Sequence, residues 1–241
     1  MPLERGRAMR SDQALQPKSL LPPSEQRQGE SPLVIIVDDD QAVREALSEL
    51  VASAGFEPVS FASTGQLLEA DLLERPGCLI LDVRMPGASG LDLQYHLAQT
   101  GNLKPIIFLT GHGDIPMTVQ AMKAGAVDFL TKPVRDQTLL DAVAAGIAAD
   151  ASRRREASAI KYNIERFETL TKRERDVLHG VASGRLNKQI AFDLSISEVT
   201  VKMHRSNAMR KMAARSLGEF VRIWETLPVS MREHSNDITR E

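Results

Sequence analysis

Residues 78–87 of the chain are Cys-Leu-Ile-Leu-Asp-Val-Arg-Met-Pro-Gly. The first four side chains are apolar, as in a buried strand, and Asp82 stands where that strand ends, just before a Pro-Gly turn. A carboxylate in such a place is costly unless it is paired, bound to a metal ion or chemically reactive. The stretch therefore predicts a buried strand that carries a functional acid at its carboxyl end.

Three other strand-like runs in the first half of the chain also lead into polar residues. They are residues 33–37 before Asp38-Asp39-Asp40, residues 106–109 before Thr110, and residues 127–131 before Lys132-Pro133. Helical spacing of apolar residues covers 42–54, 66–73, 89–99, 115–124 and 139–149, and a further strand is expected over 57–61. Alternating strands and helices predict an α/β domain of the (βα)5 flavodoxin-like type, a doubly wound parallel sheet with helices on both faces.

Ligands of an open α/β sheet bind beyond the carboxyl ends of its strands. This rule places Asp38, Asp39, Asp82, Thr110 and Lys132 around one crevice. Three crowded carboxylates repel one another, and Mg²⁺, which prefers oxygen ligands, would relieve that repulsion. The ammonium of Lys132 and the hydroxyl of Thr110 would stand beside these carboxylates. Together the groups suit the binding of a phosphoryl group, with one carboxylate as the nucleophile.

The alternative interpretation is that each acid only caps the helix after its strand. We expect this for Asp40, which stands at an N-cap position. Capping does not explain why a lysine joins Asp39 and Asp82 at the end of the fifth strand. For His112 we expect a loop residue rather than a general base, and for the only cysteine, Cys78, a small buried apolar side chain.

Composition fits a globular protein of 241 residues with 42% hydrophobic and 26% charged residues. No apolar run approaches the roughly 18 residues of a membrane span. Residues 1–31 lack the apolar core of a secretory signal, and we expect a disordered extension. A single cysteine excludes an internal disulfide and favours a cytoplasmic location.

Charge divides the chain into two parts. Residues 32–150 hold 7 Lys and Arg against 16 Asp and Glu, whereas residues 166–226 hold 12 against 7. Such a division indicates two domains with different partners, nucleic acid being a candidate for the basic one. The stretch between them, 151–166, carries Arg153-Arg154-Arg155 but no clear apolar stripe, and we expect an interdomain linker that is partly helical.

The basic part has the pattern of a helix-turn-helix. Thr171 and Glu174 form a capping-box sequence at the start of one helix. A short helix is expected over 187–194, a turn over 195–197, and a longer helix over 198–212 with Ser197 as its N-cap. Two helices joined by so short a turn are typical of DNA-binding proteins, in which the second helix enters the major groove. A last helix over 217–224 and a polar tail from 228 complete the chain.

The motifs of the first half resemble the receiver domain of two-component response regulators of the FixJ/NarL class. They are Val37-Asp38-Asp39-Asp40, Leu81–Gly87, Thr110-Gly111-His112-Gly113 and Phe129–Pro133, in a domain at 32–150. The resemblance implies that Asp82 accepts phosphate from a histidine kinase. It implies that Asp38, Asp39, Asp82 and the Arg84 backbone carbonyl hold Mg²⁺, with Asp38 acting mainly through water. Thr110 would hydrogen-bond the phosphoryl oxygens, Lys132 would pair with them, and Phe129 would be the aromatic switch residue. Residues 110–117 are typical of the nitrogen-fixation regulator branch.

The segments 170–174, 187–191 and 196–205 resemble the four-helix LuxR-type helix-turn-helix domain, placed at 167–227. By motif position we expect Lys202, Met203 and Ser206 at base edges. The residues expected at phosphates are Lys188, Thr200, Arg205 and Arg210. Ser195 stands where this turn often has glycine, and a positive φ there would cost about 1 kcal/mol. The last helix joins monomers in this family, but core packing is an equal alternative.

Together the two resemblances imply a transcriptional regulator rather than an enzyme. Phosphorylation at Asp82 would alter the surface over 115–149, promote dimerisation and release the DNA-binding domain onto a promoter, with RNA polymerase as a further partner. Two alternatives stay open at this point. One is a receiver that only pairs and takes no phosphate. The other is a phosphotransfer enzyme or phosphatase that uses Asp82 as a nucleophile.

Overall fold

The structure is a computed structural model that describes residues 31–111 and 114–233. The predictions for residues 1–30, for His112 and for residues 234–241 lie outside these ranges. Within the described chain, none of the helices is both long enough and apolar enough to cross a membrane.

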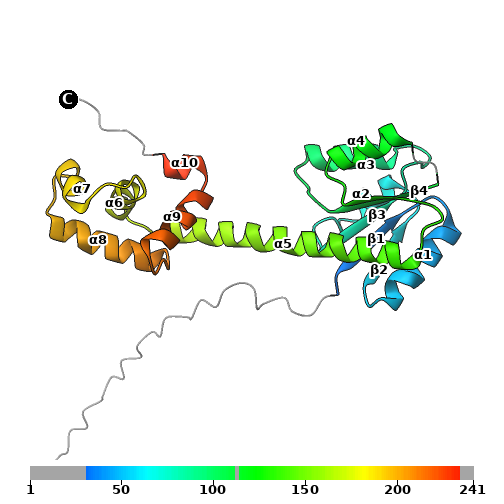
Figure 1. Ribbon diagram of the computed structural model, residues 1–241, viewed down its shortest axis with the longest axis horizontal. Helices are drawn as coiled ribbons and strands as arrows, with labels where there is room; N and C mark the ends of the chain where they lie inside the picture. Colours follow the sequence, from blue (N-terminus) through cyan, green and yellow to red (C-terminus); the bar gives the residue numbers. More distant parts are fainter. Residues whose placement is uncertain (1–30, 112–113, 234–241) are drawn as a thin grey trace, which may run out of the picture. The chain divides into compact units, whose positions relative to one another are not determined.

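Residues 33–131 contain a five-stranded parallel sheet in the order β2-β1-β3-β4-β5 (Figure 1). Its strands are β1 Leu33–Val37, β2 Glu57–Phe61, β3 Gly77–Leu81, β4 Ile106–Thr110 and β5 Asp128–Thr131. The helices between them are α1 Gln41–Ser53, α2 Thr64–Glu69, α3 Gly90–Gln99 and α4 Ile115–Lys123, and α5 Asp136–Glu168 follows. This strand order is that of flavodoxin-like folds, so the predicted fold class is confirmed.

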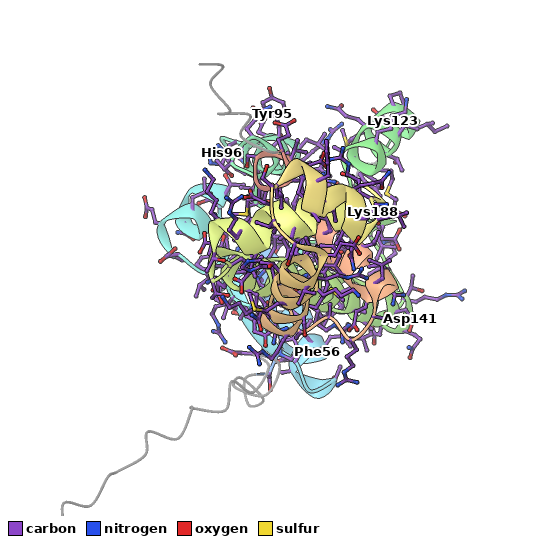
Figure 2. All side chains as sticks on the ribbon, turned by 90° about the vertical axis from the view of Figure 1, so that its left-hand side faces the viewer. Phe56, Tyr95, His96, Lys123, Asp141 and Lys188 are labelled. Carbon is purple, nitrogen blue, oxygen red and sulfur yellow. The ribbon has the colours of Figure 1, made fainter. Side chains whose placement is uncertain are left out.

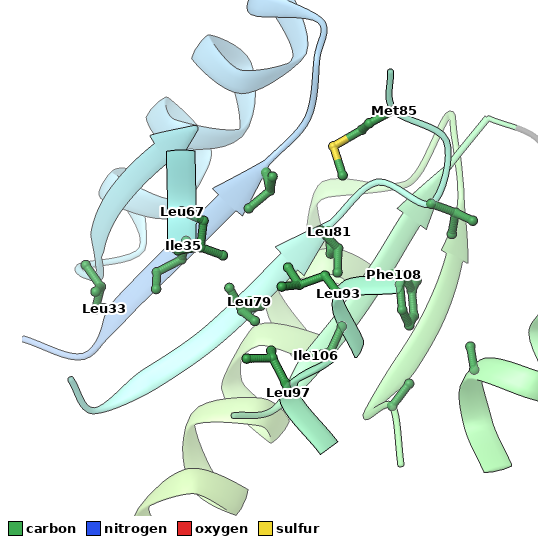
Figure 3. Close-up of a cluster of buried hydrophobic side chains, with 14 residues drawn as sticks. Leu33, Ile35, Leu67, Leu79, Leu81, Met85, Leu93, Leu97, Ile106 and Phe108 are labelled. Carbon is green, nitrogen blue, oxygen red and sulfur yellow. The ribbon is translucent and has the colours of Figure 1, made fainter. Parts of the chain in front are cut away.

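Two apolar cores sandwich the sheet because side chains alternate along each strand. Ile35 and Leu79 face one cluster with Leu67, Leu93 and other residues of α2, α3 and α4 (Figure 3). Ile36 and Ile80 face the other cluster, which α1 and α5 complete. Both faces are covered, which explains why β1, β3 and β4 are buried along their whole length.

Local signals fix several element boundaries. Asp40 caps α1 by accepting the backbone N–H groups of Ala42 and Val43, as predicted. The second helix was expected over 66–73, but Ser63 caps it earlier and it spans Thr64–Glu69. At Gly77, φ is +140° and a Cβ atom would lie 1.8 Å from the Leu33 carbonyl oxygen, so only glycine fits the start of β3.

The prediction that the last helix of the first domain ends at Ala149 is wrong, because α5 runs on to Glu168. Asp150 is only 1% exposed, and its carboxylate accepts the Gly77 backbone N–H at 3.0 Å together with the side chains of Arg153 and Arg154 at 2.6 and 2.7 Å. Residues 155–161 are exposed on all sides, which explains the missing apolar stripe. Good helix formers such as Ala, Arg, Glu and Lys sustain the helix there.

A second core forms from the end of α5 and the helices that follow it. These are α6 Lys172–Ala182, α7 Asn187–Asp193, α8 Glu198–Lys211, α9 Leu217–Thr226 and α10 Val229–Arg232. Phe167, Val177, Val201 and Phe220 lie in this core. The Thr171–Glu174 capping box and the Ser197 N-cap are confirmed, and Ser195 has a φ of +52°. The expected polar tail begins instead with α10, where Met231 packs against the core.

Candidate functional site

The carboxyl ends of the central strands bring the predicted acids together. Val37 and Leu81 are register partners in the β1–β3 pair, so Asp38 and Asp82 follow neighbouring strands at the same level. Thr110 and Thr131 are partners in the β4–β5 pair, and the Lys132 backbone N–H donates to the Thr110 carbonyl at 2.8 Å. The convergence that the sequence predicted is therefore present.

Lys132 bridges two buried carboxylates. Its Nζ lies 2.5 Å from Asp38 Oδ2 and 2.8 Å from Asp82 Oδ2. The other oxygens are also engaged: Asp38 Oδ1 accepts the Asp40 backbone N–H at 3.0 Å, and Asp82 Oδ1 accepts that of Arg84 at 3.1 Å. Both acids are thus held in fixed orientations by hydrogen bonds.

Asp39 completes a cluster of acids. Oxygen atoms of Asp38, Asp39 and Asp82 lie within 4.8 Å of one another. Asp38 and Asp82 are 3% and 8% exposed, whereas Asp39 faces solvent, so the cluster is open on one side. Three carboxylates beside one ammonium leave two negative charges unbalanced. An oxygen-rich, partly solvated site with that charge fits Mg²⁺, which keeps several of its waters.

The pKa of Lys132 reflects two opposing effects. Burial disfavours the charged ammonium and by itself lowers the pKa. Hydrogen bonds and charge attraction from Asp38 and Asp82 outweigh burial, so the pKa is raised above the ordinary lysine value. Lys132 is therefore a permanent cation at neutral pH.

Thr110 and Phe129 stand on β4 and β5, the last two strands of the sheet. Thr110 ends β4 and is 1% exposed. Phe129 in β5 is half-buried, and its ring centroid lies 5.8 Å from that of Phe108, with the planes tilted by 40°. Thr110 is thus the register partner of Thr131, and Phe129 lies in the strand that leads directly to Lys132.

Two contributors were missed from the sequence. The Arg44 guanidinium in α1 donates to the Asp38 carbonyl at 2.7 Å. A Cβ atom at Gly90 would lie 2.3 Å from the Asp82 carbonyl oxygen, so α3 approaches the site closely only because this residue is glycine. The available signals were a basic residue one turn into the helix after the acid triplet and a glycine directly after the Ser89 N-cap.

The predicted DNA-contacting residues lie on α7 and α8 and differ in their exposure to solvent. Lys202, Met203, Ser206 and Arg210 are exposed. Thr200 and Arg205 are half-buried: Thr200 Oγ1 lies 2.8 Å from Ser197 Oγ, and Arg205 donates to Asn187 Oδ1 at 3.2 Å. Lys188 on α7 is exposed (Figure 2).

Comparison with known proteins assigns both domains. Residues 34–144 match the model of the response regulator receiver domain, and residues 168–224 match that of the bacterial regulatory proteins of the luxR family. Nodulation protein W of Bradyrhizobium diazoefficiens is 51% identical over 199 residues, which cover 82% of this chain and 87% of the relative. This chain is a response regulator with a LuxR-type DNA-binding domain.

Other relatives and solved structures of response regulators support the same family assignment. Response regulator protein TodT of Pseudomonas putida is 50% identical over 83% of this chain and 88% of its own length. The solved structure of response regulator StyR has a TM-score of 0.72 at 49% identity and covers 81% of this chain and 98% of its own. Full-length FixJ from B. japonicum has a TM-score of 0.51 at 37% identity and covers 82% of this chain and 98% of its own. A receiver domain implies a histidine kinase as partner, and the LuxR-type domain implies DNA.

One ion pair and two hydrogen bonds to backbone carbonyls hold the end of α8 in the LuxR-type domain. Lys211 near its end donates to Glu174 at 2.6 Å and to the Thr169 carbonyl at 3.2 Å. Arg166 in α5 donates to the carbonyl of Met212, the C-cap of α8, at 3.2 Å. Burial by itself raises the pKa of Glu174, but hydrogen bonds from Lys211 and Thr171 outweigh it, so the pKa is lowered. The lowered pKa means that the ion pair with Lys211 favours the ionised form of Glu174.

Proposed function

We propose that the receiver is switched by phosphorylation of Asp82. The observation that supports this most directly is the Lys132 ammonium, which lies 2.8 Å from Asp82 beside the open acid cluster. A cation held at this distance from a nucleophilic carboxylate is positioned to meet the oxygens of an incoming phosphoryl group. A receiver that only formed dimers and took no phosphate would not need a lysine beside three clustered carboxylates.

In the proposed reaction, a carboxylate oxygen of Asp82 attacks the phosphorus of a phosphohistidine on the kinase. The phosphorus–nitrogen bond breaks, its electron pair returns to the imidazole, and an acyl phosphate forms on Asp82. Lys132 then exchanges its contact with the free carboxylate for one with the phosphoryl group. The hydroxyl of Thr110 at the end of β4 is proposed to hydrogen-bond another phosphoryl oxygen.

Asp38, Asp39, Asp82 and the Arg84 backbone carbonyl would hold Mg²⁺. The fit rests on the acid cluster, because the Arg84 group that contacts Asp82 is its backbone N–H and not the carbonyl. The bound ion would supply positive charge that offsets the charge on the phosphoryl oxygens. Asp38 already pairs with Lys132, which is consistent with its proposed action through water.

We propose that movement of Thr110 and Phe129 alters the surface over 115–149 and favours a homodimer. Two α8 helices would then meet adjacent half-sites of a promoter, in the cytoplasm and with RNA polymerase as a further partner. Lys202, Met203 and Ser206 are assigned to base edges. The residues assigned to phosphates are Lys188, Thr200, Arg205 and Arg210. Hydrolysis of the acyl phosphate resets the switch, so we do not propose turnover of small phosphate esters.

The test measures phosphate incorporation in the full chain. Wild type is incubated with phosphoramidate and Mg²⁺, and its intact mass is compared with those of two variants. Asp82→Asn should take up no phosphoryl group. Asp40→Asn should behave as wild type, because Asp40 is an exposed helix cap that asparagine can replace. Loss of incorporation in both variants, or in neither, would reject Asp82 as the acceptor.

A further inference from the structure

Two apolar side chains on α8 face solvent. Val199 is 76% exposed and Met203 is 52% exposed. They are four residues apart, so they lie on one face of the helix, one turn above the other. The core does not need them, because Val201 and Ala208 supply the buried face of α8 and Met212, its C-cap, is also buried there.

The same face carries the exposed polar residues Lys202 and Ser206. Val199 stands in the first turn of α8, two residues after the Ser197 cap. In helix-turn-helix proteins it is the first part of the second helix that contacts base edges. The stripe made by Val199, Lys202, Met203 and Ser206 is thus where a DNA-reading surface is expected, and half of it is apolar.

The major groove offers one apolar group to such a surface, the C5-methyl group of thymine. Phosphates, sugars and the other base edges in the groove present charges, donors or acceptors. An apolar pair therefore gains from contact with the thymine methyl group. Against the other bases it would take water away from hydrogen-bond donors and acceptors without offering them a new partner.

We infer that Val199 and Met203 read thymine methyl groups and so determine which half-sites this regulator selects. The inference rests on the proposed function and adds a residue, Val199, that the motif did not assign. Val199 is β-branched and stiff about χ1, so its methyl groups are held in fixed positions. Met203 is unbranched and adapts to its surroundings. Of the two residues, Val199 should therefore discriminate more strongly between thymine and the other bases.

The experiment removes the methyl groups one at a time. A duplex is first selected from random DNA by binding to the phosphodonor-treated full chain, and each thymine is then replaced by uracil, which pairs identically but lacks the methyl group. Wild type should lose about fourfold in affinity per contacted methyl, the value expected for one buried carbon. The loss should occur at one or two positions in each half-site.

Variants assign the effect to residues. Val199→Thr keeps the shape of the side chain but replaces a methyl by a hydroxyl, and it should bind the thymine and uracil duplexes equally at one position. Met203→Ser should do the same at another position. Val229→Thr is the matched control, since Val229 is 56% exposed on α10, and it should keep the full thymine dependence.

Three outcomes would overturn the inference. The first is that wild type binds the selected duplex with no effect of uracil at any position. The second is that Val199→Thr weakens binding to the thymine and uracil duplexes by the same factor, which indicates a role in folding or backbone contact. The third is that Val199→Thr leaves DNA binding unchanged but reduces transcription, which indicates a contact with polymerase. Failure to select any duplex would instead contradict the proposed DNA-binding function itself.

Discussion

Replacing Lys132 by methionine removes the ammonium that lies between two buried carboxylates, at 2.5 and 2.8 Å. Methionine keeps the unbranched stem, so the change is mainly one of charge. Leaving one side of a buried ion pair without its partner costs about 3–5 kcal/mol. The Lys132 side chain is 23% exposed, so we expect the lower end, about 3 kcal/mol in the free energy of unfolding of the receiver domain.

Urea denaturation of the full chain, followed by circular dichroism, measures this loss in chelator and again in excess Mg²⁺. The deficit should shrink with Mg²⁺, because a divalent cation among Asp38, Asp39 and Asp82 replaces the missing positive charge. Lys123→Met is the control: Lys123 is an exposed lysine of α4 (Figure 2), and its loss should stay within about 0.5 kcal/mol.

The pH dependence has a definite sign. The pKa of Lys132 is raised on folding, so its stabilisation is complete below the ordinary lysine value of about 10.4 and is lost as pH rises through the raised value. The difference between wild type and Lys132→Met should therefore be constant from neutral pH to about pH 10. A variant as stable as wild type in chelator, or a deficit that Mg²⁺ does not reduce, would refute the reasoning.

The remaining predictions concern other buried charges and DNA. Burial lowers the pKa of Lys104 to about 8, although Asp150 opposes the shift. Lys104→Met should therefore stabilise the receiver by about 1–2 kcal/mol near pH 7, and this gain should shrink as pH rises above 8. A loss of stability at pH 7, measured by urea denaturation, would contradict the prediction. Glu174→Gln should destabilise the LuxR-type domain by about 2 kcal/mol, because it breaks the ion pair with Lys211. This effect should be present above about pH 4.3 and be lost as pH falls through the lowered pKa of Glu174. A thermal unfolding midpoint equal to that of wild type would exclude the ion pair as a stabilising contact. Arg210→Ala should weaken binding to all DNA sequences alike and reduce the slope of log affinity against log salt concentration by about 1. Lys202→Ala should instead relax the sequence preference. An equal loss of affinity on every sequence would reject a base-reading role for Lys202.

Much of the fold and the site followed from local signals. The apolar runs before Asp38, Asp82 and Thr110 are the strands, because burial on both faces leaves little room for polar residues. The rule for carboxyl ends then placed Lys132 beside acids that are 94 and 50 residues away in sequence.

Other features depend on contacts that no local pattern contains. The helical stretch beyond Ala149 has no apolar stripe because solvent surrounds residues 155–161. It is held instead at one end by the buried Asp150 and at the other by Phe167, which packs against Trp224 with a ring separation of 5.9 Å. The outward exposure of Val199 likewise follows from how α8 packs and not from its residue type.

The double anchoring of α5 determines how the protein can be divided. A receiver fragment that stops before Arg153 loses both arginine side chains that donate to Asp150, and a DNA-binding fragment that begins after Phe167 loses the Arg166 bond to Met212 and the Phe167 ring. Residues 155–161 make neither kind of contact with a core. Proteolytic cuts, and junctions for chimeras that join this receiver to the output domain of a relative, therefore belong within these seven residues.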